Sequence, residues 1–145
     1  MHGSAQRWSE ALADLNRALR LHPDYASALV NRGNVYAALG RREDAMADFT
    51  RALALARTNG PPEMAAYALA RRGTLQRQSG HTLPALNDLL AAVRMAPRSG
   101  IVRLLLGQYL LDIGYRRDAS EQLGIACALG ENQACALQQT LQGRF

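Results

Sequence analysis

The hexapeptide NRGNVY at residues 31–36 recurs as RRGTLQ at residues 71–76 and as LLGQYL at residues 105–110. In each copy a second glycine follows the first after seven residues, and then an alanine, a large apolar residue and another alanine follow at intervals of five, four and three. The first glycines of the last two copies are 34 residues apart, whereas those of the first two are 40 apart. A unit of this length that recurs along a chain predicts stacked structural repeats that share one elongated core.

Length and composition favour a single all-helical domain. The chain has 145 residues, of which 48% are hydrophobic and 20% are charged, and this suffices for one buried core. Alanine and leucine far outnumber valine, isoleucine and threonine, as is typical of helical proteins. Since no stretch approaches the ~18 consecutive apolar residues of a membrane-spanning helix, we expect no membrane insertion.

The spacing resembles that of the tetratricopeptide repeat, a helix pair with a small residue where its two helices cross. The resemblance covers nearly the whole chain. It implies an all-α superhelix, or α solenoid, of about three full helix pairs with a leading half repeat and a C-terminal capping helix. The expected units are a half repeat at 6–25, repeats at 26–59, 66–99 and 100–131, and a capping helix at 132–142.

Two departures from the repeat pattern bear on the structure. The second helix of a repeat is matched by Trp8, Ala11, Leu15, Ala18 and Pro23, but only seven residues precede Trp8. Helix 6–21 then leaves part of its apolar stripe uncovered, so self-association through this helix, or a place in a larger protein of the family, is an alternative function. Six extra residues around the Gly-Pro-Pro at 60–62 either lengthen the preceding helix or form a protruding loop.

The chain is basic, with a net charge of +5 from seventeen arginines and no lysine against twelve acidic residues. Residues 66–99 hold five arginines and one aspartate, so most of the excess lies there. Such a patch attracts acidic peptides or nucleic acid, or is an ordinary solvated surface. Nucleic acid is the weaker candidate, because only eight residues are aromatic, Trp8 and Phe49 fall at core positions, and single-strand binders need exposed stacking platforms.

The resemblance also implies a concave wall, made mainly by the first helix of each repeat, on which the family binds peptides. Position by position, it gives these candidate peptide-binding residues: Asn31, Asn34, Tyr67, Arg71, Thr74, Arg77 and Gln108. Asn31 and Arg71 match positions that hold a terminal carboxylate in the family, but Tyr67 stands where the family has a lysine. At most half of that clamp is present. We expect Arg71 with Asn31 to orient an acidic peptide; the alternative is that Arg71 only solubilises the groove.

The sequence offers no catalytic constellation. The three histidines lie at one end and in two turns, no pair of them has metal-ligand spacing, and neither cysteine has a histidine nearby. Acidic residues of the second helices, such as Asp48, are expected on solvated faces. We therefore expect no catalytic residue, no metal and no cofactor, and a protein-interaction scaffold that binds an extended peptide or a partner helix.

The C-terminal segment 126–137 resembles the helix-turn-helix of the related Sel1-like repeats. In cysteine-rich members of that group, two cysteines with the spacing of Cys127 and Cys135 join one repeat to the next, so the resemblance implies a disulfide here. The alternative is a pair of buried thiols, as is the rule in a reducing cytosol. A disulfide would favour an extracytoplasmic location, such as the periplasm of a bacterium, over the cytoplasm.

Overall fold

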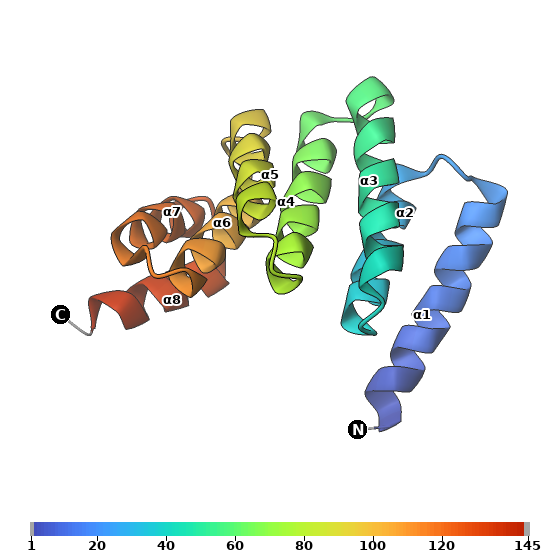
Figure 1. The fold of residues 1–145 in the computed structure, drawn as a ribbon, viewed down its shortest axis with the longest axis horizontal. Helices are drawn as coiled ribbons and strands as arrows, with labels where there is room; N and C mark the ends of the chain where they lie inside the picture. The colour runs from blue at the N-terminus through green and yellow to red at the C-terminus, as the bar shows by residue number, and fades with distance from the viewer. Residues whose placement is uncertain (1, 144–145) are drawn as a thin grey trace.

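The computed structural model describes residues 2–143, and this part of the chain consists of eight helices without a β-strand (Figure 1). The helices are α1 (His2–Leu21), α2 (Ala26–Ala38), α3 (Arg42–Asn59), α4 (Pro62–Gln78), α5 (Thr82–Met95), α6 (Gly100–Asp112), α7 (Arg116–Ala128) and α8 (Asn132–Gln142). The all-α fold expected from the sequence is confirmed. No helix in the described residues is long and apolar enough to cross a lipid bilayer.

The helices follow one another along the long axis of the molecule, from α1 at one end to α8 at the other (Figure 1). The main packing partners are α2 with α3, α4 with α5, and α6 with α7, while α1 packs on α2 and α8 on α7. Helix α4 also contacts α2 and α6, so these three helices form a continuous layer. The result is a solenoid of three complete helix pairs with one extra helix at each end.

The extra residues between the first two pairs lengthen helices and do not form a loop. Helix α3 runs through Asn59, and α4 begins at Pro62. Gly60 ends α3 by donating its backbone N–H to the carbonyl of Ala56, and Pro62 starts α4 in the first turn, where a helix tolerates a missing N–H. Helix α1 begins at His2, four residues before the expected start.

The core of each pair is the crossing of its two helices at a glycine. A Cβ atom added to Gly33 would lie 2.6 Å from Cε1 of Phe49, and one added to Gly107 would lie 2.7 Å from Cδ2 of Leu123. At Gly73 the nearest atom would be the backbone oxygen of Ala85, at 2.9 Å. The repeated glycines are therefore required by contact. The repeated alanines and large apolar residues of the second helices are all fully buried: Ala45, Phe49, Ala52, Ala85, Leu89, Ala92, Ala119, Leu123 and Ala126.

The second glycine of each copy makes the turn between the two helices. Gly40, Gly80 and Gly114 have φ of +79°, +87° and +94°, and Gly130 adopts the same conformation at +100° between α7 and α8. Only glycine adopts this left-handed region readily, which ends one helix and reverses the chain within about three residues.

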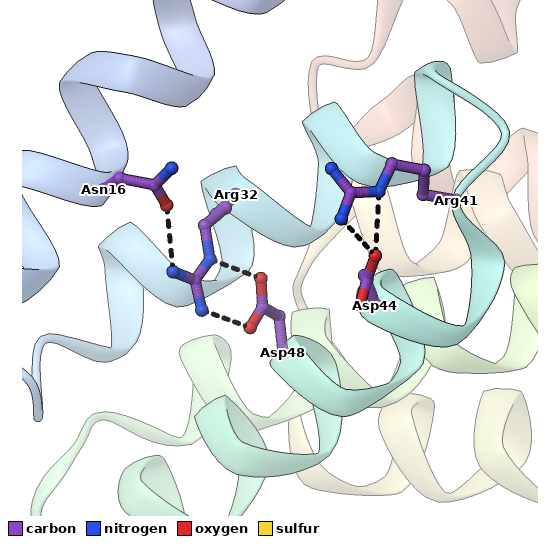
Figure 2. A network of polar contacts seen from close by, with 5 residues as sticks. All are labelled: Asn16, Arg32, Arg41, Asp44 and Asp48. Atoms are coloured by element: carbon purple, nitrogen blue, oxygen red, sulfur yellow. Dashed lines mark hydrogen bonds and ion pairs between the residues drawn. The ribbon is translucent and has the colours of Figure 1, made fainter.

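An ion pair joins the two helices of the first pair, and another joins the two helices of the second pair at the equivalent positions. Arg32 donates from Nε and Nη2 to the carboxylate of Asp48, at 2.8 and 2.7 Å, and from Nη1 to Asn16 of α1 at 3.1 Å (Figure 2). Arg72 holds Asp88 in the same way, at 2.8 and 3.0 Å. The expectation that Asp48 lies on a solvated face is wrong, because Asp48 is only 5% exposed.

Each arginine directly precedes the crossing glycine, and each aspartate directly precedes the large apolar residue that packs on it, so the close approach of the helices brings the charges together. Hydrogen bonding to the aspartates raises the pKa of Arg32 and Arg72 above the ordinary value, against the opposing effect of burial. In the third pair, Leu106 and Gln122 occupy these positions, and Gln122 accepts a hydrogen bond from Arg103 instead.

The C-terminal helix closes the solenoid. Ala134 and Leu141 of α8 form one buried cluster with Leu104, Leu123 and Ala126 of the last pair. The exposed residues of α8 are mostly polar: Asn132, Gln133, Ala136, Gln139, Thr140 and Gln142. Helix α8 thus presents a largely polar face at this end of the core.

The glycine crossings can be tested with a matched pair of substitutions. Gly73→Ala is expected to destabilise the protein by about 1–3 kcal/mol, because the new methyl group meets a backbone oxygen that cannot move aside. Gly124→Ala meets only the end of the flexible Gln138 side chain, so it should be neutral or gain up to ~1 kcal/mol of helix propensity. Urea unfolding monitored by circular dichroism measures both, and equal effects would contradict the crossing model.

The buried ion pair makes a second prediction. Asp48→Asn removes the charge that Arg32 binds with two hydrogen bonds, and we expect a loss of about 2 kcal/mol in the free energy of unfolding. Asp44→Asn removes the exposed pair with Arg41, shown beside it in Figure 2, and should cost less than about 0.5 kcal/mol. Thermal unfolding at low and high salt measures the loss of stability in each variant. A similar loss in both variants would show that the burial of Asp48 does not affect stability.

Candidate peptide-binding groove

A pocket of about 440 Å³ opens between α1, α2 and α4. Its lining contains the apolar residues Trp8, Ala37, Ala38, Phe49 and Leu75 and the polar residues Asn34, Tyr67, Arg71, Thr74 and Gln78. The pocket therefore combines aromatic and aliphatic surface with hydrogen-bonding groups, which is the usual composition of a ligand site.

The polar side is organised by a chain of hydrogen bonds across the two helices. Arg71 of α4 donates from Nε to Oδ1 of Asn34 on α2 at 2.9 Å, and Nδ2 of Asn34 donates to the hydroxyl oxygen of Tyr67 at 3.4 Å. Asn34 thus fixes the position of the guanidinium group with a single bond to its inner nitrogen. Among the described residues, neither Nη1 nor Nη2 of Arg71 has a hydrogen-bond acceptor, so four N–H donors of this side chain remain for a ligand.

No lining residue of this pocket is a carboxylate, a histidine or a cysteine. The hydroxyl of Thr74 donates to the backbone oxygen of Ala70 at 2.8 Å. The pocket therefore contains a cation, amides and hydroxyl groups, without a base that could activate a nucleophile. Within the described residues, no group of three His, Cys, Asp or Glu side chains is placed to hold a metal ion.

Two sequence comparisons relate the chain to a known family. The family model described as "Tetratricopeptide repeat" matches residues 1–65. "Tetratricopeptide repeat protein 36" of Danio rerio is 36% identical over 85 residues, which are 59% of this chain and 44% of that protein. Both comparisons support a tetratricopeptide repeat protein. It spans less than half the length of this curated relative.

Solved structures of tetratricopeptide repeat (TPR) proteins share the fold. The Cut9–Hcn1 hetero-tetramer of the APC/C contains a chain with a TM-score of 0.70 at 16% identity, and the similarity covers 86% of this chain and 23% of that one. The first TPR domain of Spaghetti (RPAP3), bound to the HSP90 peptide SRMEEVD, has a TM-score of 0.65 at 15% identity and covers 82% of this chain and 91% of that one. Proteins of this repeat family are generally non-catalytic and bind protein or peptide partners.

The structure brings together four of the seven residues predicted to bind a peptide. Asn34, Tyr67, Arg71 and Thr74 all line the pocket. Asn31, Arg77 and Gln108 do not line it. Asn31 is exposed on α2 one turn before Asn34, and Gln108 is partly buried on α6. The sequence predicts that Arg71 acts with Asn31. In the structure its Nε is bonded to Asn34 instead, whose side chain is the one on α2 that lies within hydrogen-bonding distance.

Arg77 lies on α4 beyond the pocket, where its charge acts on Tyr109 of α6. Burial raises the pKa of the Tyr109 hydroxyl above its ordinary value, and the positive charge of Arg77 opposes this shift. That hydroxyl donates to the backbone oxygen of Thr82 at 2.9 Å. The Nε atom of Arg77 is buried without an acceptor in the described part of the chain.

The one aspartate among the five arginines of residues 66–99 pairs with an arginine of the same segment. Arg72 is neutralised by Asp88, whereas Arg71 and Arg77 have no ion pair with any described residue. The arginines of α4 without an ion pair among the described residues are therefore Arg71 and Arg77, the two that the sequence predicts to line the groove.

Trp8 is the pocket residue that the sequence misplaced. Its register in the second helix of a repeat predicts a core position, but the side chain is 40% exposed and lines the pocket. The signal was that, among the described residues, no helix packs on α1 as α2 packs on α3. Phe49, the other aromatic residue expected in the core, is fully buried.

The two cysteines lie at the opposite end, joined in the structure by a disulfide between α7 and α8. Their Cα atoms are 4.7 Å apart, across the turn at Gly130. In this geometry a disulfide forms without movement of the backbone. We propose that this disulfide forms in the cell.

We predict that freshly purified protein, unfolded without reductant and alkylated, carries no added alkyl group, whereas reduced protein carries two. The geometry of the turn favours the bond, and the closed loop is short, so its chain-entropy contribution is roughly 2.5 kcal/mol. Intact-mass spectrometry measures this directly, with a Cys127→Ser/Cys135→Ser variant as control. Two alkylated thiols in the unreduced protein would remove the disulfide and the argument for an oxidising compartment.

Proposed function

We propose that this TPR domain is a non-catalytic peptide receptor that binds an extended acidic segment along α2 and α4. The observation that carries the proposal is the guanidinium of Arg71, held by Asn34 at 2.9 Å with its outer nitrogens unoccupied in a pocket. A carboxylate is the natural ligand for such a group, because two parallel N–H donors match its two oxygens.

The rest of the pocket extends this recognition beyond one charge. The hydroxyl of Tyr67 and the amide of Gln78 also line the pocket and provide further donors. Trp8 and the alanines of α2 line it as well and provide apolar contacts for a side chain next to the acidic residue. We infer a ligand in which an acidic group, either a side chain or a terminal carboxylate, neighbours an apolar residue.

The similarity to the Spaghetti domain supports this proposal by fold. That domain is bound to a peptide, SRMEEVD, in which three of seven residues are acidic. At 15% identity the similarity does not carry over individual residues. The specific expectation for this chain rests on its own pocket.

We predict that a fluorescein-labelled acidic heptapeptide, with SRMEEVD as the first probe, binds in a fluorescence-anisotropy titration. Arg71→Ala should weaken binding at least about ten-fold, since a hydrogen bond to a charged group contributes ~1.5–3 kcal/mol. Arg94→Ala removes the same charge from an exposed site on α5 and serves as the matched control.

Two further measurements distinguish recognition from general attraction. Replacing the acidic residues of the peptide by glutamine should abolish the difference between native protein and Arg71→Ala. Raising the salt from 50 to 300 mM should weaken binding of the acidic peptide, because partly exposed charges are screened. Equal affinities of Arg71→Ala and Arg94→Ala would overturn the assignment of the pocket.

A further inference from the structure

Helix α1 has the register of the second helix of a repeat, but the structure contains no first helix to cover it. Counting back 34 residues from Ala45, Phe49 and Ala52 gives Ala11, Leu15 and Ala18. In α3 these positions are 0, 1 and 0% exposed, because α2 packs on them. In α1 all three are partly exposed. This face of α1 is therefore built as one side of a helix crossing whose other side is missing from the described residues.

The charge at the same face gives the chemistry of the missing helix. Asp14 lies 34 residues before Asp48 and has the same place in the repeat as Asp88. Both of those aspartates accept two hydrogen bonds from an arginine on the first helix of their own pair. Asp14 is exposed, and it has no ion pair or hydrogen bond with any described side chain.

The helices of this chain do not supply the missing element. Arg-Gly pairs occur at 32–33 and 72–73, but their helices α2 and α4 are already paired with α3 and α5. Helix α6 has leucine before its crossing glycine. Helix α8 has a largely polar outer face, with Gln139 and Thr140 exposed and without an arginine. A second copy could fill the site only by breaking one of its own pairs.

We propose that the exposed face of α1 binds an amphipathic helix from outside residues 2–143 that carries arginine directly before glycine or another small residue. The arginine would pair with Asp14, as Arg32 pairs with Asp48. The small residue would lie on Leu15, as Gly33 lies on Phe49, where even a methyl group would come within 2.6 Å of the ring. The bound helix completes a fourth repeat, and this interaction is separate from the proposed peptide groove.

The chain itself provides the probe. A fluorescein-labelled peptide of residues 26–40, which contains Arg32 and Gly33, is expected to bind the intact protein in an anisotropy titration. Asp14→Asn should weaken this binding about ten-fold or more, the range for hydrogen bonds to a charged group. Glu121→Gln, which removes one exposed charge from α7, should leave it unchanged. Peptides with Arg32→Ala or Gly33→Leu should lose binding.

A charge swap makes the test independent of folding defects. Asp14→Arg should abolish binding of the native peptide, and a peptide with Arg32→Asp should restore it. Because an isolated helix of this length is only marginally stable, the same peptide is also tethered to the N-terminus through a flexible Gly-Ser linker. The tethered peptide should raise Tm, and Asp14→Asn should remove most of that rise.

The outcomes separate the alternatives. Failure of both the free and the tethered peptide, or binding that ignores Asp14, would overturn the proposal. A concentration-dependent dimer in sedimentation velocity that Leu15→Asp disrupts would assign this face to a second copy and also overturn it. Arg71→Ala should retain binding of the 26–40 peptide, so failure of the groove proposal and failure of this one are distinguishable.

Discussion

The close crossing of paired helices at a glycine is the constraint on which the rest of the structure depends. With no Cβ at Gly33, Gly73 and Gly107, the two backbones approach until the large apolar residue of the second helix touches the first. That distance also lets Arg32 and Arg72 reach across to an aspartate and still touch the preceding helix. The close crossing therefore provides the packing within all three helix pairs. In the first two pairs it also lets an arginine bind an aspartate and contact the preceding helix.

The sequence was sufficient to predict the helices and their pairing because glycine and alanine positions report directly on backbone approach. It was not sufficient for the side-chain partners. Asp48 looks like an ordinary acidic residue of a helix surface until the 16-residue spacing from Arg32 is compared with that from Arg72 to Asp88. That repeated spacing indicates from the sequence that each arginine and aspartate form an ion pair.

The groove shows a different limit. Asn34 and Asn31 are both asparagines on α2, one turn apart, and only the packing of α4 decides which of them meets Arg71. Trp8 likewise has the register of a core residue, yet its side chain is 40% exposed and lines the pocket. Position in a repeat predicts which side chains share a face, whereas their partners depend on distances of a few ångströms.

The polar outer face of α8 has a consequence for the size of any assembly. A head-to-tail interface joins two different ends of a molecule, so it builds an open-ended filament unless one end cannot bind the next subunit. Here the end at α1 is open, and the end at α8 offers glutamine, asparagine and threonine in place of an apolar seam. The exposed face of α8 therefore offers no apolar seam to α1 of a second molecule, which disfavours a head-to-tail fibre built from residues 2–143.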